Sequence, residues 1–261
     1  MLEINAINAA LTGTIFSGKL HYLRVTESTN IDAVAAGRIG APHGSVWVAD
    51  EQTAGRGRSD HEWLSAAGQG LYVSVLLRLR IPPARLLLLP LAAGLAAAAA
   101  VRQAAGLEAD LRWPNDLLIG PRKVAGILAE AASGFAVVGI GINVHQQSFP
   151  DGLATPATSL DLEAKRRISR ETVLAELLKA LANQAETLAD ATAAAEIPGR
   201  VASISSWITG RRVEVHGPQA CTGTTAGLDE HGFLRVETDA GLVTVQTGGI
   251  RAAAPDSSTM E

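Results

Sequence analysis

The chain has 261 residues, with 22 lysines and arginines against 26 aspartates and glutamates, and its formal net charge is −4. Hydrophobic residues make up 47% and charged residues 18% of the sequence, a balance that excludes an intrinsically disordered chain. The slightly acidic balance also argues against binding to duplex nucleic acid, which depends on neutralisation of phosphates by lysine and arginine.

Two features bear on where the protein works. The single cysteine, Cys221, cannot form an internal disulfide, and the N-terminus lacks the basic start and apolar block of a secretory signal. We therefore expect a cytoplasmic protein. The apolar stretch 86–101 is shorter than the roughly 18 residues that a membrane span needs and contains Pro90 and Gly94, so we predict a buried core helix and no membrane association.

Short apolar, β-branched runs alternate with helical stretches between residues 20 and 144. The runs predict strands at 45–50, 71–77, 111–113, 124–130 and 135–144. Between the second and third of these strands, an Ala/Leu-rich helix is predicted from Ala84 to Ala105, and Gly106 ends it. Because the connections between strands are short, we expect mostly antiparallel neighbours.

The last third of the chain has a different pattern. Ser169 is the predicted N-cap of a helix whose apolar stripe consists of Val173, Leu174, Leu177, Leu178, Leu181 and Leu188. From Gly210 onward, short strands at 211–216, 233–238 and 242–246 alternate with glycine-rich turns, which predicts a small all-β module packed against the first domain. We therefore divide the chain into a larger domain at 1–205, a small β-barrel at 206–254 and a flexible tail at 255–261.

Two glycine-rich segments resemble nucleotide-binding motifs incompletely. Residues 13–20 (GTIFSGKL) fit the phosphate-loop pattern except at Leu20, which lacks the hydroxyl that binds magnesium, and no apolar strand leads into Gly13. Residues 139–143 (GIGIN) end a strand and lack both the third glycine and the following helix of a dinucleotide-binding motif. We interpret the first as an ordinary turn and draw no Rossmann-fold prediction from the second.

The segment 51–63 (EQTAGRGRSDHEW) is a candidate anion-binding loop. Gly55 and Gly57 allow the backbone to approach a ligand closely, while Arg56 and Arg58 supply donors suited to a carboxylate or a phosphate. A solvated turn is the alternative interpretation.

Residues 113–116 (WPND) precede a turn at Gly120 and Pro121, and Lys123 follows that turn. A hairpin here could bring Asp116 close to Lys123. The pair could be an ordinary ion pair at the mouth of a hairpin. Alternatively, the Asp116 carboxylate could bind a metal or an amine, and Lys123 could neutralise a phosphate.

Ser28, Thr29 and Asn30 by themselves could either cap a helix or line a ligand pocket. Together with Gln52 and GRGR, with WPND and the KVAGIL segment at 123–128, and with GIGINV, they closely resemble the motifs of the biotin protein ligase family in order and spacing. The resemblance runs from about residue 20 to 160 and resumes at 248–250 (GGI). It implies an α+β fold with a mixed, largely antiparallel sheet, related to class II aminoacyl-tRNA synthetases, and an SH3-like barrel at the C-terminus.

The resemblance further implies an ATP-dependent enzyme. It would join ATP and biotin, with Mg²⁺, to form biotinyl-5′-adenylate and pyrophosphate, and would then transfer the biotinyl group to one lysine of a biotin carrier domain such as that of acetyl-CoA carboxylase. In the first step a carboxylate attacks the α-phosphate of an anionic nucleotide, so cationic groups must offset the repulsion between them.

Site residues are also carried over from the resemblance, within the domain 1–205. Arg58, Lys123 and Asp116 are expected to be catalytic, with Asp116 orienting magnesium or the acceptor lysine. Biotin is expected to contact Ser28, Thr29, Asn30, Gln52, Gly55, Arg56, Gly57, Arg58, Lys123, Gly126 and Gly139. ATP is expected to contact Arg58, Trp63, Asn115, Lys123 and Asn143.

The sequence departs from the family pattern in two places. Ser59, Asp60, His61 and Glu62 stand where many relatives have further glycine and arginine, which lowers the positive charge of the loop. No tryptophan occurs near 155–160, where some relatives place an aromatic side chain against adenine, so adenine must be covered by other groups.

Two other functions compete with the leading one. A lipoate or octanoate ligase or transferase of the same superfamily is disfavoured by GRGR and Gln52. A non-catalytic biotin sensor is disfavoured by Arg58, Asp116 and Lys123, because a sensor needs no groups that neutralise phosphate.

About twenty residues precede the first matching strand, too few for the winged-helix domain of DNA-binding relatives, so we expect no DNA binding. Both a monomer and a homodimer are compatible with the sequence.

Overall fold

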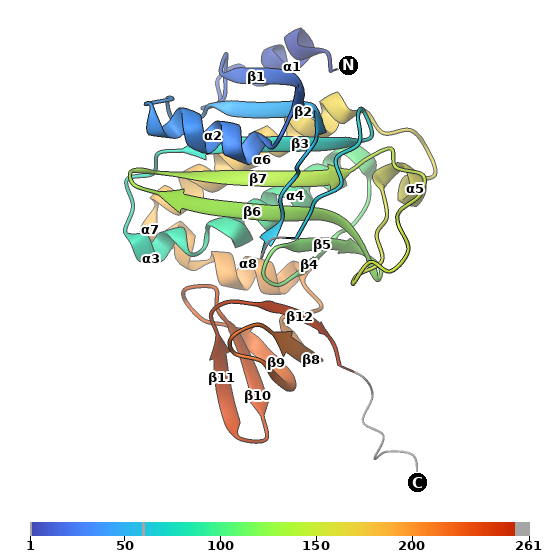
Figure 1. Ribbon diagram of the computed structural model, residues 1–261. Coiled ribbons are helices and arrows are strands. Elements are labelled where there is room, and N and C mark those ends of the chain that lie inside the picture. The colour runs from blue at the N-terminus through green and yellow to red at the C-terminus, as the bar shows by residue number, and fades with distance from the viewer. Residues whose placement is uncertain (1, 59–60, 254–261) are drawn as a thin grey trace.

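The computed structural model describes residues 2–58 and 61–253. Two β-sheets organise this part of the chain, a larger one in the N-terminal domain and a smaller one that begins at β8 (Figure 1). The predictions made for Ser59, Asp60 and the tail at 255–261 lie outside the described residues.

Within the described ranges the larger sheet has seven strands in the order β1-β2-β3-β7-β6-β5-β4. The strands are β1 (Leu20–Thr26), β2 (Val46–Gln52), β3 (Gly70–Leu77), β4 (Asp110–Arg112), β5 (Asp116–Ile119), β6 (Arg122–Ala132) and β7 (Phe135–Asn143). β1 and β2 are parallel because the helix α2 (Thr29–Arg38) crosses between them, and the other neighbours are antiparallel as expected. β5 was not predicted as a separate strand, because four residues are too short to show a period.

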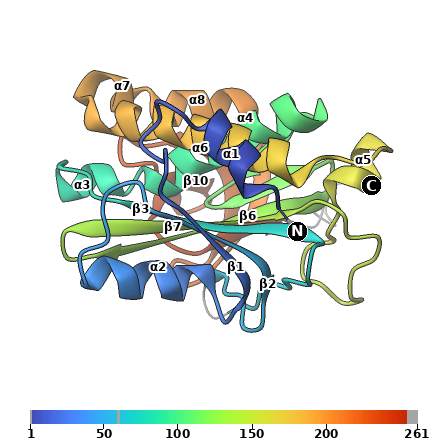
Figure 2. The ribbon, with the colours of Figure 1, turned by 90° about the horizontal axis from the view of Figure 1, so that it is seen from above.

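Helices cover both faces of this sheet. In Figure 2, α2 lies below the sheet, and the other helices lie above it. Those above are α1 (Ile4–Ala10), α3 (Pro83–Leu86), α4 (Leu89–Ala105), α5 (Leu160–Ala164), α6 (Arg170–Ala189), α7 (Ala191–Ala195) and α8 (Ile197–Ile204). Since helices pack on both sides, the central strand β3 is buried along its whole length, which explains its continuous apolar sequence.

The Ala/Leu-rich helix lies in the core of this domain. The helical segment Pro83–Ala105 is long and apolar enough to span a membrane. However, 61% of its apolar 18-residue stretch is buried inside the protein. The predicted helix is divided into α3 and α4, and Gly106 ends it in a left-handed conformation. Gly94 lets α4 lie close to the sheet, because a Cβ atom there would come 2.5 Å from the Leu111 side chain.

The helix predicted to begin after Ser169 is α6. The Ser169 hydroxyl accepts a hydrogen bond from the backbone N–H of Thr172, which confirms the N-cap. All six residues of the predicted apolar stripe are buried. This helix packs against α4, and together they form the layer above the sheet.

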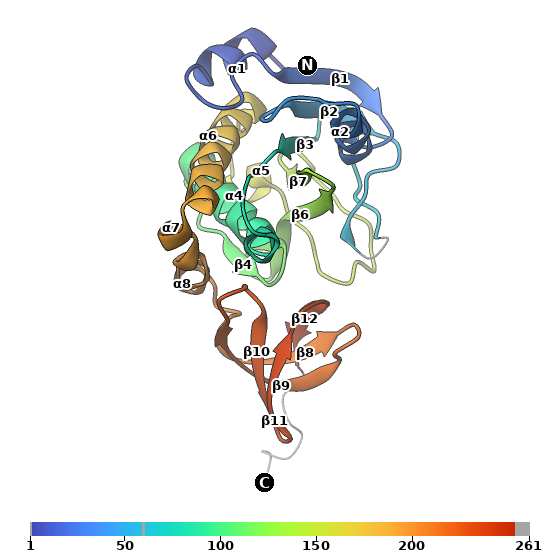
Figure 3. The same cartoon turned by 90° about the vertical axis from the view of Figure 1, so that its left-hand side faces the viewer.

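The smaller sheet is antiparallel throughout, in the order β11-β10-β9-β8-β12. Its strands are β8 (Thr209–His216), β9 (Cys221–Leu228), β10 (Leu234–Thr238), β11 (Gly241–Val245) and β12 (Gly249–Ala252). β9 and β12 were not predicted, because their threonine, glycine and alanine residues lack the apolar alternation of the other strands. This SH3-like module lies beside the β4 end of the larger sheet (Figure 3), and the buried Trp113 indole donates a hydrogen bond to the Gly232 carbonyl across the contact.

The two incomplete nucleotide motifs have structural roles. The ammonium of Lys19 donates hydrogen bonds to the carbonyl oxygens of Ile15 and His43, both at 2.9 Å, so it closes a turn. The GIGIN residues belong to β7, in the centre of the larger sheet. Both agree with the sequence analysis.

Candidate active site

A cavity of about 920 Å³ lies between the larger sheet and the C-terminal module. Its walls come from the start of α2, the GRGR loop, the β5–β6 hairpin, β7, the loop after β7, and two turns of the C-terminal module at 216–218 and 247–251. The volume lies within the range of small-molecule ligand pockets.

One end of the cavity is a buried network of neutral polar groups. Ser28, Thr29 and Asn30 are each no more than 3% exposed. The Gln52 side-chain oxygen accepts hydrogen bonds from the backbone N–H and hydroxyl of Thr29, at 2.9 and 3.1 Å. The Ser74 hydroxyl lies 2.7 Å from that of Thr29 and donates to Asn30 Oδ1. Ser28 stands at the N-cap of α2, but its side chain makes no capping hydrogen bond.

Glu130 extends this network toward the GRGR loop. Asn30 Nδ2 donates a hydrogen bond of 2.7 Å to one oxygen of Glu130, and the Arg56 guanidinium lies 3.7 Å from the other. The network therefore orients donors and acceptors for a compact, neutral polar group, with an arginine at its edge.

Glycines of β6 and β7 form the floor of the cavity. A Cβ atom on Gly139 would lie 2.1 Å from Asn30 Oδ1, and one on Gly141 would lie 2.4 Å from the Trp63 ring. A Cβ on Gly126 would come 3.0 Å from Trp63 and 3.3 Å from the Lys123 ammonium. The absence of side chains at these positions lets the polar network and the indole lie directly on the sheet.

Replacement of Gly139 with alanine is expected to displace Asn30 and to weaken ligand binding at this end by about tenfold or more, with a loss of unfolding free energy of about 1–3 kcal/mol. Calorimetric titration and thermal melting measure the two effects. Gly199→Ala on α8 is the matched control, because a Cβ there meets nothing within 4 Å. Unchanged binding in Gly139→Ala would contradict the proposed role of the glycine floor.

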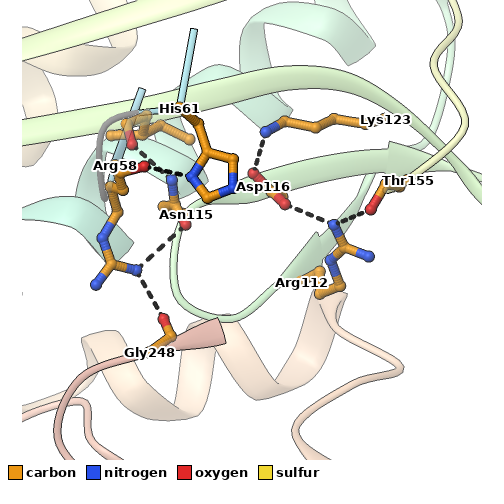
Figure 4. A network of polar contacts seen from close by, with 9 residues as sticks. Arg58, His61, Arg112, Asn115, Asp116, Lys123, Thr155 and Gly248 are labelled. Atoms are coloured by element: carbon orange, nitrogen blue, oxygen red, sulfur yellow. Dashed lines mark hydrogen bonds and ion pairs between the residues drawn. The ribbon is translucent and has the colours of Figure 1, made fainter. Parts of the chain in front are cut away.

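Charged side chains gather in the middle of the cavity (Figure 4). Asp116 lies between two cations: one carboxylate oxygen is 2.6 Å from the Lys123 ammonium, and the other is 2.6 Å from the Arg112 guanidinium. The Asp116 and Arg112 side chains are only 15% and 10% exposed, so this is no ion pair at the exposed mouth of a hairpin. The three side chains carry one negative and two positive formal charges.

Arg58 of the GRGR loop lies beside this group. Its guanidinium donates to Asn115 Oδ1 at 3.4 Å and to the Gly248 carbonyl of the C-terminal module at 3.0 Å (Figure 4). Burial lowers the pKa of Arg58, and the nearby Asp116 carboxylate raises it in part. Arg58 and Lys123 thus share one cavity, as the sequence predicted.

Trp63 covers the glycine floor. The Lys123 ammonium lies 5.2 Å from the centroid of its ring, a cation–π distance. Among the described residues, the buried indole N–H has no hydrogen-bond partner. A polar ligand atom could satisfy this donor.

All but one of the predicted site residues line the cavity. Gly55 does not: a Cβ there would meet the Trp63 carbonyl at 2.3 Å and the Ser65 hydroxyl at 2.7 Å, so Gly55 allows two segments of the loop to approach each other. The Asn143 amide lines the cavity but also donates to the Thr158 carbonyl at 3.0 Å, so it anchors the loop after β7.

Several residues of the site were not predicted from the sequence. Arg112, Phe149 and the two turns of the C-terminal module also line the cavity, and Glu130 contacts its lining residues Asn30 and Arg56. The position of Arg112 immediately before the WPND motif was an available signal. The turns 216–218 and 247–251 are distant in sequence from the other motifs, and only the packing of the module brings them there.

Comparison with known proteins assigns the chain to a family. Residues 22–147 match the Biotin/lipoate A/B protein ligase family, and residues 208–250 match the Biotin protein ligase C terminal domain. The biotin–[acetyl-CoA-carboxylase] ligase of Mycobacterium tuberculosis is 34% identical over 241 residues, which cover 89% of this chain and 88% of the relative. This chain belongs to the biotin protein ligase family. The ligase is also 32% identical to the bifunctional ligase/repressor BirA of Bacillus subtilis, over 95% of this chain and 78% of that protein.

Solved structures agree with this assignment. The ligase resembles the biotin protein ligase from Aquifex aeolicus in complex with biotin and ATP, with a TM-score of 0.79 and 32% identity over 90% of this chain and 100% of that chain. The α+β fold with its mixed, largely antiparallel sheet and the SH3-like C-terminal module are therefore confirmed, and so is the prediction of a ligase enzyme.

Proposed function

We propose that this ligase activates biotin with ATP to form biotinyl-5′-adenylate and pyrophosphate, and then transfers the biotinyl group to a lysine of a biotin carrier domain. The observation that carries this proposal is the single cavity in which a neutral polar network, Arg58 and Lys123 meet. The names of the relatives and the biotin and ATP complex of the Aquifex aeolicus enzyme support the same substrates.

The polar network is suited to the ureido end of biotin. A neutral bicyclic ring with a urea group needs both donors and acceptors in an enclosed pocket rather than charge. The side chains of Asn30 and Gln52 are held by hydrogen bonds with Glu130, Ser74 and Thr29; together with Ser28 they would provide these groups and orient the valerate carboxylate toward the cations.

Arg58 and Lys123 would then act on the reacting groups. Binding of the biotin carboxylate and of the α-phosphate beside these two cations would offset their mutual repulsion, and the same cations would stabilise the charge that develops during attack. Both side chains already line the cavity.

The described residues fit a magnesium ligand set poorly. They contain no group of three His, Cys, Asp or Glu side chains that could hold a metal ion, and both oxygens of Asp116 already face a cationic nitrogen. Mg²⁺ more often binds one or two carboxylates together with substrate phosphates. We therefore keep Mg²⁺ as a proposed requirement of the ATP reaction and assign no step to an ion on Asp116.

Asp116 has a different proposed role in the second half-reaction. The acceptor lysine must lose a proton before its amine attacks the adenylate, and a carboxylate within hydrogen-bond distance can accept or orient that proton. The name of the Mycobacterium tuberculosis relative supports the carrier domain of acetyl-CoA carboxylase as acceptor.

The reaction is tested with the pure ligase, ATP, Mg²⁺ and biotin, lipoate or octanoate. Release of pyrophosphate that depends on biotin is expected, followed by a mass increase of one biotinyl group on an added carrier domain. Preference for lipoate or octanoate would favour a lipoate or octanoate ligase or transferase, and biotin binding without pyrophosphate release would favour a non-catalytic biotin sensor.

Cytoplasmic localisation, the absence of DNA and membrane binding, and a monomeric or homodimeric state stay predictions.

The loop after β7 would provide the apolar cover for adenine, since no tryptophan stands near 155–160. Phe149 and Leu153 line the cavity on this loop. Phe149→Ala is expected to raise the KM for ATP about fivefold or more, with little change in the KM for biotin, because stacking on a base contributes about 1–3 kcal/mol. Steady-state pyrophosphate release measures both constants. An equal rise in both KM values would contradict this role.

A further inference from the structure

The contact between Lys123 and Asp116 presents a problem for substrate binding. The Lys123 ammonium lies 2.6 Å from an Asp116 oxygen, and the two side chains are 26% and 15% exposed. A lysine paired so closely with a carboxylate has little net charge to offer an anion, because the pair is neutral as a whole.

Arg112 changes that balance. Its Nη2 atom lies 2.6 Å from the other Asp116 oxygen, so the carboxylate remains paired when Lys123 leaves it. Figure 4 shows the Asp116 carboxylate between the lysine and the arginine. With Arg112 included, the group has a formal charge of +1 instead of 0.

Arg112 is itself held firmly in place. The residue is 8% exposed, and the same Nη2 atom donates a hydrogen bond of 2.9 Å to the Thr155 hydroxyl on the loop after β7. Its guanidinium also lies 5.5 Å from the centroid of the buried Trp207 ring, at the entrance to the C-terminal module. β4 and β5 pair so that Arg112 lies directly opposite Asp116.

We propose that Arg112 is a positioning residue that keeps Asp116 paired, so that the Lys123 ammonium can move from Asp116 to the carboxylate of biotin. This rests on the proposed role of Lys123 at the substrate anion. Arg112 acts through Asp116 and Lys123: its contacts tie the hairpin to the loop after β7, and its charge leaves the group with a surplus positive charge.

The test compares biotin with biotinamide, which has the same ring system but no negative charge. In titration calorimetry without nucleotide, Arg112→Gln binds biotin about ten- to hundredfold more weakly than the wild type, while biotinamide binding changes less than threefold. Arg112→Lys, which keeps the charge, recovers most of the loss. Arg122→Gln is the matched control, because Arg122 adjoins Lys123 but pairs with Glu163 at 2.8 Å.

Two variants of Asp116 distinguish this role from a purely structural one, because they are expected to maintain or increase the affinity for biotin. Asp116→Asn binds biotin at least as tightly as the wild type, because it releases Lys123. The double variant Arg112→Gln/Asp116→Asn binds biotin at least tenfold more tightly than Arg112→Gln, because the carboxylate that retained the lysine is gone. If Arg112→Gln does not fold, the Asp116→Asn result still decides.

The proposal is overturned if Arg112→Gln binds biotin normally, if biotin and biotinamide weaken equally, if Arg122→Gln reproduces the effect, or if Asp116→Asn weakens biotin binding. Failure of the wild type to bind biotin would instead overturn the proposed function. The two failures are therefore distinguishable.

Discussion

Replacement of Lys123 with alanine is expected to slow biotinyl-adenylate formation by about a hundred- to thousandfold while the protein stays folded. The ammonium is the cation that lies between Asp116, the Trp63 ring and the open cavity. Without it, one of the two cations that offset the repulsion between the biotin carboxylate and the nucleotide phosphates is lost, and Arg58 remains. Biotin-dependent pyrophosphate release under single-turnover conditions measures the loss.

The fold is expected to survive this substitution because Asp116 keeps Arg112 as a partner. The melting temperature should therefore change by only a few degrees. Lys179→Ala is the control: Lys179 also forms an ion pair, with Glu176 at 2.9 Å, but on the half-exposed surface of α6. Wild-type adenylation by Lys123→Ala would refute the assigned role.

Arg58→Ala is expected to have a comparable effect on the first half-reaction, about a hundredfold or more. Its guanidinium is the donor of the GRGR loop that reaches both the β4–β5 elbow, through Asn115, and the C-terminal module, through the Gly248 carbonyl. The substitution removes a cation from the cavity and also a contact between two domains. We expect the KM for ATP to rise as well as kcat to fall.

Arg58→Lys separates charge from geometry. A lysine keeps the positive charge but cannot reproduce the planar fork of guanidinium donors, so we expect partial recovery of the rate at best. Arg102→Ala is the control, since Arg102 on α4 pairs with Glu108 at 3.0 Å and is 68% exposed. Full activity of Arg58→Ala in pyrophosphate release would show that the loop arginine has no part in adenylation.

Several parts of the site could be predicted because the relevant contacts are local. Asp116 and Lys123 are joined by a short hairpin, and their ion pair follows from the turn at Gly120. The α6 cap and stripe follow from helical periodicity, and the GRGR loop from its residue types. The family resemblance then joined these separate motifs into one ligand site.

Other parts of the site depend on strand register and loop geometry, which the sequence pattern does not show. The pairing of Arg112 with Asp116 depends on the β4–β5 register, and the pairing of β5 with β6 contains a bulge between Leu117 and Leu118. Gly55 does not line the cavity, and a Cβ atom there would meet the Trp63 carbonyl, which returns to it across the loop. None of these relations has a periodic signal in the sequence.

The family resemblance gave the α+β class. The sequence by itself determined the helix boundaries that caps and glycines mark, and the kinds of groups available to bind a vitamin and a nucleotide. These properties depend on neighbours along the chain, where residue type decides the outcome. Only the tertiary structure decided that Asp116 lies between two cations, that β-strand glycines form the floor beneath Trp63, and that the C-terminal module closes the cavity at Gly248. Such contacts arise from strand register and domain packing, which the local amino-acid sequence does not specify.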